Sequence, residues 1–229
     1  MSAVDRIREV GIVPVVRATS AAEALEAVEA IRAGGIPILE ITLTVPGAVQ
    51  IIATLTGRFS DETLIGAGTV LDTDSAHACI DAGAHFIVSP SLDLPTIALC
   101  RRLGVPIFPG ALTPTEIVTA WKAGADAVKV FPANALGGPS YLKSVKAPLP
   151  QIELIPTGGV SLKNAADFIT AGAFAIGVGA DLVDLAALRR GEASAITEKA
   201  REYVAAVAAA RTPTRSAGVS PAGSAASRR

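Results

Sequence analysis

The stretch Lys122-Ala-Gly-Ala-Asp-Ala-Val-Lys129 decides the fold, because close copies of it recur along the chain. They begin at Arg32, Asp81 and Thr170, and a looser copy begins at Arg102. In each copy a glycine follows a helix-like segment, where the left-handed turn that ends a helix is favoured, and a short apolar run typical of a buried strand comes next. A repeated helix-to-strand junction indicates a parallel sheet whose crossovers are helices.

Outward from these copies, the sequence divides into eight units of a strand followed by a helix. We predict strands near residues 12–16, 37–41, 64–66, 85–88, 106–108, 126–130, 152–155 and 174–177. We predict helices near 20–33, 47–57, 73–82, 93–103, 114–123, 138–146, 161–171 and 181–209, the last broken around Gly191, with caps at Ser20, Asp72, Thr113 and Ser161.

Eight such units predict an α/β protein with a (β/α)8 TIM barrel as a single domain over residues 1–210. A doubly wound open sheet is the alternative. That fold usually carries a glycine-rich turn after its first strand, and Val15-Val-Arg-Ala-Thr has none. Residues 211–229 are rich in Pro, Gly, Ser and Ala without periodicity, so we predict a disordered tail there.

The composition narrows the class of protein. Hydrophobic residues make up 50% of the 229 residues and the net charge is -1, so the sequence predicts a globular protein without the basic excess that binds nucleic acid or membranes. Two cysteines, no signal peptide and no bilayer-length apolar run predict a cytoplasmic protein. With two histidines and no local acidic cluster, we expect no metal and no other cofactor.

Three charged residues lie in or at the end of predicted strands: Arg17, Glu40 and Lys129. Charges in such apolar strands are costly unless they are paired or used, and a barrel's active site lies at the carboxyl ends of its strands. A neutral lysine amine there is a nucleophile toward ketones. The alternatives are a lysine that reaches the strand end and a structural ion pair with Glu40. Glu153 sits early in its strand, so we expect it outside the site.

Glycine turns follow the last two predicted strands, in Pro156-Thr-Gly-Gly-Val-Ser and Gly177-Val-Gly-Ala-Asp. Each turn opens a predicted helix. Because glycine lets backbone N–H groups approach an anion at a helix N-terminus, two such turns together predict a phosphate site.

The sequence resembles a known family, the class I aldolases that act on 2-keto-3-deoxy-6-phosphogluconate (KDPG) and 4-hydroxy-2-oxoglutarate (KHG). The resemblance runs in family order from about residue 10 to 210 and leaves out the tail. Its segments are Val16-Arg-Ala, Leu39-Glu-Ile-Thr-Leu-Thr-Val-Pro, Ile65-Gly-Ala-Gly-Thr-Val-Leu, Phe86-Ile-Val-Ser-Pro, Pro109-Gly-Ala-Leu-Thr-Pro-Thr-Glu, Val128-Lys-Val-Phe-Pro-Ala, Pro156-Thr-Gly-Gly-Val and Ala175-Ile-Gly-Val-Gly.

The resemblance implies a metal-independent homotrimer that cleaves KDPG, and also KHG, through a Schiff base on Lys129. Glu40 is then the general acid and base. Thr69 contacts the pyruvyl part of the substrate, and Pro90 lies in a matching substrate-binding segment.

The same resemblance assigns the outer part of the substrate, a phosphorylated 2-keto acid. Thr157 governs stereochemistry at C4, and Gly158, Gly159 and Gly179 offer backbone to the phosphate. Two positions depart from the family pattern: Thr44 stands where some members have a carboxylate-binding arginine, leaving Arg17 for that task, and Ala180 stands where many have a phosphate-binding serine.

Three alternatives remain open from the sequence. An aldolase for the galactonate epimer of KDPG is the nearest, although Thr157 favours the gluconate type. A phosphate-binding barrel isomerase or epimerase needs paired acids or metal-bound histidines at strand ends, which we do not find. A non-catalytic trimeric barrel scaffold has no use for both Lys129 and Glu40.

Overall fold

The computed structural model describes residues 1–59 and 62–212. Its strands are β1 (Ile12–Val16), β2 (Ile38–Thr42), β3 (Leu64–Gly68), β4 (Phe86–Val88), β5 (Ile107–Phe108), β6 (Gly110–Ala111), β7 (Val128–Val130), β8 (Leu154–Pro156) and β9 (Ile176–Val178). Its helices are α1 (Ala3–Val10), α2 (Ala21–Ala33), α3 (Ala48–Phe59), α4 (Thr73–Asp81), α5 (Leu94–Leu103), α6 (Pro114–Ala123), the 3-10 helix η2 (Ala133–Leu136), α7 (Pro139–Lys146), α8 (Ala165–Thr170), α9 (Leu185–Arg189) and α10 (Ala193–Arg211).

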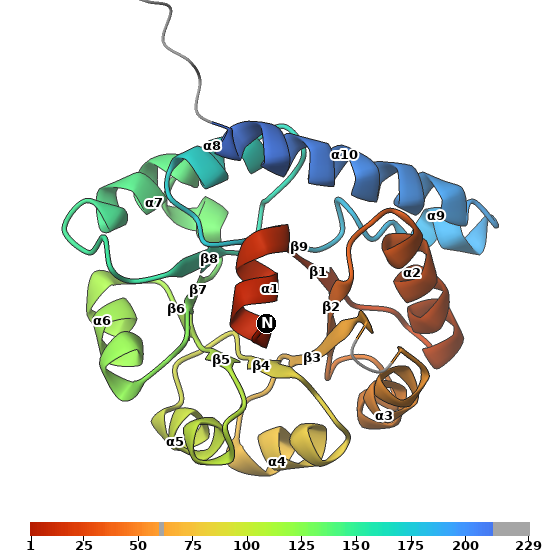
Figure 1. The fold of residues 1–229 in the computed structure, drawn as a ribbon, viewed down its shortest axis with the longest axis horizontal. Helices are drawn as coiled ribbons and strands as arrows, with labels where there is room; N and C mark the ends of the chain where they lie inside the picture. The colour runs from red at the N-terminus through yellow and green to blue at the C-terminus, as the bar shows by residue number, and fades with distance from the viewer. Residues whose placement is uncertain (60–61, 213–229) are drawn as a thin grey trace, which may run out of the picture.

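The strands form a closed parallel barrel inside a ring of helices (Figure 1). Hydrogen bonding links the strands in the orders β5-β4-β3-β2-β1-β9 and β6-β7-β8. A parallel bridge between Thr157 and Gly177 joins β8 to β9, and β5 and β6 are one predicted strand interrupted at Pro109. The predicted TIM barrel is therefore confirmed, and the open doubly wound sheet is excluded.

The helices begin and end largely as the sequence predicts. The side chains of Ser20, Asp72 and Thr113 each accept a hydrogen bond from the third residue of the helix that follows, which satisfies a free N–H there. Gly124 ends α6 in the left-handed conformation with φ 99°. The prediction for Ser161 is wrong, because its N–H donates to the side chain of Asn164 and α8 begins only at Ala165.

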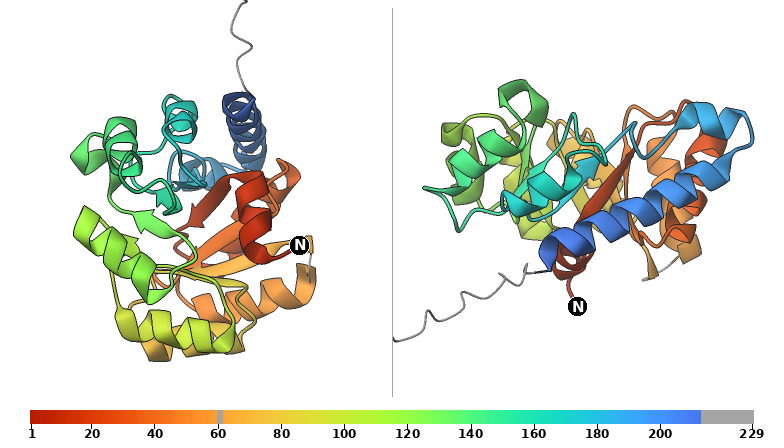
Figure 2. Two further views of the ribbon diagram at one scale, coloured as in Figure 1. Left: turned by 60° about the vertical axis from the view of Figure 1, so that its left-hand side comes forward. Right: turned by 90° about the horizontal axis from the view of Figure 1, so that it is seen from above.

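Two of the helices that the structure describes were not predicted. The first is α1, which starts with a reciprocal capping box between Ser2 and Asp5 and ends at Gly11. It lies across one end of the barrel (Figures 1 and 2), where Ile7 is fully buried. The second is η2, which follows β7. The last predicted helix is interrupted at Gly191 as expected, because α9 and α10 lie on either side of it.

The barrel interior is filled in layers. Strand alternation turns Ile38 and Glu40 of β2 to the inside of the barrel, as it does Lys129 of β7 and Ala127 just before that strand. Below the two charges lies a buried apolar cluster that α1 covers through Ile7. The cluster also contains Val13, Ile38, Leu64, Phe86, Val88, Phe108, Ala127, Ile155, Phe174 and Ala175. We call this end of the barrel the floor and the carboxyl end of the strands the mouth.

The end of α10 is tied to the floor. Arg211, which the sequence assigns to the tail, is the last residue of the helix and donates to the carbonyls of Glu9 at 2.6 Å and Phe174 at 3.2 Å. Residues 213–229 of the predicted tail lie outside the described residues. Among the described helices, none is both long and apolar enough to cross a membrane.

Candidate active site

Lys129 and Glu40 meet inside the barrel although β2 and β7 lie far apart around it. Lys129 is the central residue of β7 and Glu40 the central residue of β2. Both residues are almost completely buried, at 3% and 2% exposure. The Lys129 Nζ lies 3.9 Å from the Glu40 Oε1, too far for a direct hydrogen bond but close enough for one reacting group to contact both.

The Glu40 carboxylate is arranged for a transient partner. Its Oε1 is buried and accepts no hydrogen bond from the described residues. Such an acceptor is costly to bury, and native structures keep few of them outside functional sites. A cavity of about 10 Å³, near the minimum for one water molecule, lies against Glu40, Lys129 and Thr157. The pair therefore suits a proton transfer through water or to a substrate oxygen.

Two glycines make room for these side chains, and the sequence analysis missed both roles. A Cβ on Gly68 would collide with the Glu40 carboxylate, and a Cβ on Gly177 would collide with the Thr157 hydroxyl. Gly68 stood in a matching family segment and Gly177 in a glycine turn. Neither position carried a signal of which side chain it accommodates.

Thr157 connects the inner cavity to a larger cleft at the mouth. It is buried, and it lines both spaces. The cleft has a volume of about 340 Å³. Its other lining residues come mostly from the two glycine turns and include several of the predicted site residues. They are Arg17, Phe131, Gly158, Gly159, Val160, Ser161, Gly177, Gly179, Ala180 and Asp181.

The cleft offers positive charge and backbone donors. Arg17 lies beside the second turn, since its Nη1 would be 3.1 Å from a Cβ on Gly179. In the part of the chain that the structure describes, the N–H groups of Gly159, Val160, Ala180 and Asp181 are not used in backbone hydrogen bonds. Gly158 and Gly159 have φ values of 93° and 74°, a conformation that favours glycine. This combination suits an anion.

Thr69 and Pro90 follow neighbouring strands at the mouth but line neither space. Thr69 has a φ of 59°, the one positive value among the described residues other than glycine. Such backbone strain is concentrated at functional sites. The backbone of Pro90 packs on Gly110, where a Cβ would collide with it. Thr69 and Pro90 therefore remain predicted site residues.

Thr44 is not gathered into the site. It is exposed on the loop after β2, its hydroxyl is 2.7 Å from that of Thr42, and it lines a separate surface cleft with Pro46 and Ala78. Glu153 lies at the floor and pairs with Arg8 of α1 at 2.9 Å. This agrees with its expected position outside the site.

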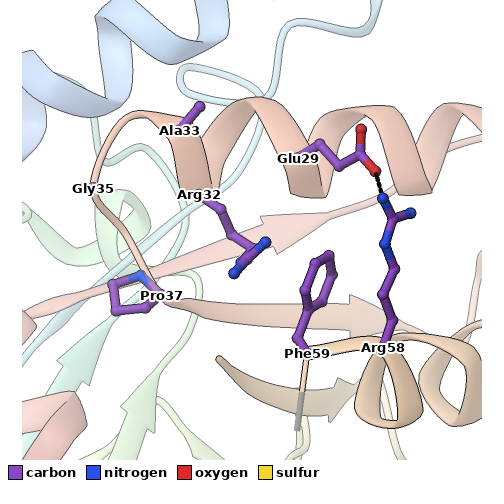
Figure 3. A pocket seen from close by; sticks show the side chains of 7 residues that line it. All are labelled: Glu29, Arg32, Ala33, Gly35, Pro37, Arg58 and Phe59. Atoms are coloured by element: carbon purple, nitrogen blue, oxygen red, sulfur yellow. Dashed lines mark ion pairs between the residues drawn. The ribbon is translucent and has the colours of Figure 1, made fainter. Parts of the chain in front are cut away.

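Another pocket, near the beginning of β2, contains an aromatic ring between two arginines (Figure 3). The Arg32 guanidinium stacks on Phe59 at 3.7 Å from the ring centre. Arg58 pairs with Glu29 at 2.6 Å, and Arg32 lies 3.7 Å from a Glu62 carboxylate oxygen. Because both cations have acidic partners and the pocket lies beside the amino end of β2, we assign it no part in the chemistry.

The chemistry available at the mouth is that of an amine and a carboxylate beside an anion cleft. Among the described residues, no group of three or more His, Cys, Asp or Glu side chains is arranged to hold a metal ion. A ketone carbonyl that reached the inner cavity from the cleft would meet the Lys129 amine. A hydroxyl further along the same molecule would lie toward Glu40 and Thr157, with a terminal anion in the cleft.

Comparison with known proteins shows which family the sequence matches. The model of the family described as KDPG and KHG aldolase matches residues 4–199. The chain is 34% identical over 193 residues to the KHG/KDPG aldolase of Escherichia coli K12, which covers 84% of this chain and 90% of the relative. It is 40% identical over 149 residues to the 2-dehydro-3-deoxy-6-phosphogalactonate aldolase of the same strain, which covers 65% and 72%.

Solved structures give the same picture. A KDPG aldolase from Legionella pneumophila, with pyruvate captured at low pH as a covalent carbinolamine intermediate, matches with a TM-score of 0.81 and 31% identity. The match covers 88% of this chain and 97% of that one. A structure described as native KDPGal matches with a TM-score of 0.79 and 35% identity, covering 87% and 95%.

Proposed function

Because the chain belongs to the KDPG and KHG aldolase family, which are carbon–carbon lyases, we propose that it cleaves KDPG to pyruvate and glyceraldehyde 3-phosphate through a Schiff base on Lys129. The observation that carries the proposal is the buried approach of Lys129 Nζ to Glu40 Oε1 at 3.9 Å. A nucleophile and a proton-transfer group within reach of one substrate are what a class I aldolase needs.

The reaction begins with addition of the Lys129 amine to the C2 ketone. Loss of water from the carbinolamine gives an iminium, which draws electrons from the C3–C4 bond. Glu40, through a water, takes the proton of the C4 hydroxyl as that bond breaks, and the aldehyde leaves. The resulting enamine is protonated at C3, and water hydrolyses the imine to release pyruvate and free Lys129.

The cleft supports a substrate with a terminal phosphate. Arg17 supplies charge, and the two glycine turns supply N–H donors without a hydroxyl at Ala180. KHG, which has no phosphate, is the second substrate that we propose, cleaved to pyruvate and glyoxylate. Because it has no phosphate, it makes no use of the phosphate-binding part of the cleft.

The galactonate epimer of KDPG is the second candidate substrate, and the 40% identity to a galactonate-type relative supports it. The two substrates differ at C4, the carbon whose hydroxyl loses its proton. Thr157 lies between the inner cavity and the cleft, and its hydroxyl donates a long hydrogen bond to the Ile155 carbonyl at 3.4 Å. We assign preference for the gluconate form to this hydroxyl. Comparing kcat/KM for both epimers in the wild type and in Thr157→Val tests the assignment.

The decisive experiment treats the protein with pyruvate and borohydride. We expect irreversible inactivation and one reduced pyruvyl group, located on Lys129 by peptide mass mapping. Lys129→Ala should abolish both labelling and turnover while the barrel still folds. Glu40→Gln should cut turnover by ~10²–10⁴, the usual contribution of general acid–base catalysis, yet still trap pyruvate.

Matched controls are Lys143 and Lys146 of α7, outside the barrel interior. Labelling of either, or an active Lys129→Ala variant, would contradict the proposal. The homotrimer and the cytoplasmic location implied at the outset stay predictions. Light scattering at several protein concentrations tests the first of them.

A further inference from the structure

We propose that Asp181 is a positioning residue that fixes the two glycine turns of the cleft in the arrangement that binds the substrate's phosphate. The inference rests on the function proposed above, and it names the residue that sets the geometry of the cleft proposed to bind the phosphate. Asp181 lines the cleft at the end of the second turn. Its position is unexpected, because a carboxylate beside a phosphate is repulsive.

The hydrogen bonds of Asp181 explain why a carboxylate stands there. Its Oδ2 accepts from the Tyr203 hydroxyl at 2.6 Å and from the backbone N–H of Leu162 at 3.4 Å. Lys199 Nζ lies 3.5 Å from the same oxygen. Leu162 follows the first glycine turn, and Tyr203 and Lys199 belong to α10. One oxygen thus joins both turns to a long helix that packs on the barrel.

Tyr203 anchors this arrangement in the core. Tyr203 is fully buried, and burial together with the hydrogen bond to Asp181 raises the pKa of its hydroxyl. The hydroxyl is therefore a permanent donor at neutral pH, and it keeps Oδ2 directed toward α10. Lys199 offsets the charge of the Asp181 carboxylate, which reduces its repulsion of an anion in the cleft.

The second glycine turn, which ends at Asp181, carries N–H groups that can donate to the phosphate. The Gly179 carbonyl accepts from Leu182 and Val183 at 3.0 and 2.9 Å, so the turn is folded on itself. Within the described residues, the N–H groups of Ala180 and Asp181 donate no backbone hydrogen bond, so they can bind a ligand. Because no serine hydroxyl assists at Ala180, the angle of these N–H groups decides how well phosphate binds, and Asp181 sets that angle.

The test removes the Tyr203 hydroxyl and keeps its ring. Tyr203→Phe should raise KM for KDPG about three- to tenfold, since a displaced donor weakens binding without touching the chemistry. The kcat for KDPG and both constants for KHG should stay within about twofold of the wild type. The chain's other tyrosine gives the matched control. Tyr141→Phe removes a hydroxyl that donates to the Leu112 carbonyl outside the cleft, and it should leave both KM values unchanged.

Variants at position 181 separate position from charge. Asp181→Asn keeps an oxygen for Tyr203 and should stay nearer the wild type than Asp181→Ala, with KM for KDPG rising in the order wild type, Asn, Ala. If KM for KDPG falls in both variants, the carboxylate only repels phosphate and the inference is wrong.

Two further results would overturn the inference while leaving the proposed function intact. One is a lower melting temperature in Tyr203→Phe with all four kinetic constants unchanged. The other is an equal rise in KM for KDPG and KHG. A wild-type protein that cleaves neither substrate and is not labelled at Lys129 would instead overturn the proposed function, and this inference with it.

Discussion

The carboxylate of Glu40 occupies the space that a side chain at position 68 would need. A Cβ on Gly68 would collide with Oε1, Cδ and Cγ of Glu40. Gly68 ends β3 beside Thr42 of β2, two residues beyond Glu40, so the Glu40 side chain leans toward the mouth over the neighbouring strand. Gly68 thereby provides the room in which Glu40 approaches Lys129.

Gly68→Ala should therefore impair catalysis more than folding. We expect kcat to fall about tenfold or more, toward the ~10²–10⁴ loss of Glu40→Gln, because the carboxylate has to move. The added methyl group should also cost about 1–3 kcal/mol of stability as an overpacked core position. Pyruvate trapping on Lys129 should persist. The measurements are kcat for KDPG, thermal unfolding and borohydride labelling.

Gly57→Ala is the control, since a Cβ at Gly57 meets no atom within 4 Å and the residue lies within α3. It should leave kcat unchanged and stabilise the helix by about 0.5–1 kcal/mol. Full activity in Gly68→Ala would mean that Glu40 does not need its observed position.

Ala180→Ser should restore a hydroxyl to the second glycine turn. One neutral hydrogen bond contributes about 0.5–1.5 kcal/mol, so we expect KM for KDPG to fall several-fold. KHG has no group at this distance from the reacting carbon, so its KM should stay the same. Steady-state kinetics on both substrates checks this, and an equal change for the two would mean that the turn does not contact the phosphate.

Glu23 should make stability depend on acid pH. Its carboxylate accepts from the Thr19 N–H at 2.7 Å, and this bond chiefly holds its pKa below the ordinary 4.5, helped by the Thr19 hydroxyl and Arg189 against a smaller opposing effect of burial. Because the folded pKa is depressed, the stabilisation is present above pH 4.5 and is lost as the pH falls through the folded value.

Glu23→Gln should therefore lower the melting temperature at pH 7, and its difference from the wild type should narrow below pH 4.5. Glu26→Gln, an exposed position of the same helix, is the control and should have little effect at any pH. A difference that stays constant between pH 7 and pH 3 would show that the charge of Glu23 contributes nothing.

The two cysteines should be protected in the folded protein. Burial raises the pKa of Cys79 and of Cys100 from 9.0 to about 11, with Asp126 adding to the effect at Cys100. At pH 8 both thiols are then neutral and enclosed, so iodoacetamide should modify them only after denaturation. Because the folded pKa is raised, the two buried thiols contribute to the free energy of unfolding in full below pH 9. That contribution is lost as the pH rises through about 11. Rapid alkylation of the native protein would contradict this.

The parts of the fold that depend on local sequence were predictable. The recurring phrase around Gly83 and Gly124 specifies a helix end and a buried strand within eight residues, and the observed strands begin within two residues of the predicted ones. In contrast, Ile7 is the one buried residue of α1, so this helix has no repeat of apolar residues that would predict it. Its capping box at Ser2 and Asp5 and its terminal Gly11 were the available signals.

The site divides in the same way. Lys129 and Glu40 stand out in sequence because each is a charge within an apolar strand, but their separation of 3.9 Å exists only once the barrel closes. The clearances at Gly68 and the bond from Tyr203 to Asp181 depend on neighbours that no local pattern identifies. Thr44 stands in a matching motif, yet its side chain is exposed beside a separate surface cleft.

The buried apolar cluster beneath Lys129 determines the order in which substrates bind and products leave. Ile7 and the cluster around it fill the floor of the barrel. Substrates and products therefore enter and leave through the mouth. In the reaction proposed above, pyruvate is bound covalently at the inner end and lies behind the aldehyde on this path. The aldehyde must therefore depart first and pyruvate second. In the synthetic direction pyruvate must enter before its partner, which makes the enzyme an ordered one by architecture as well as by chemistry.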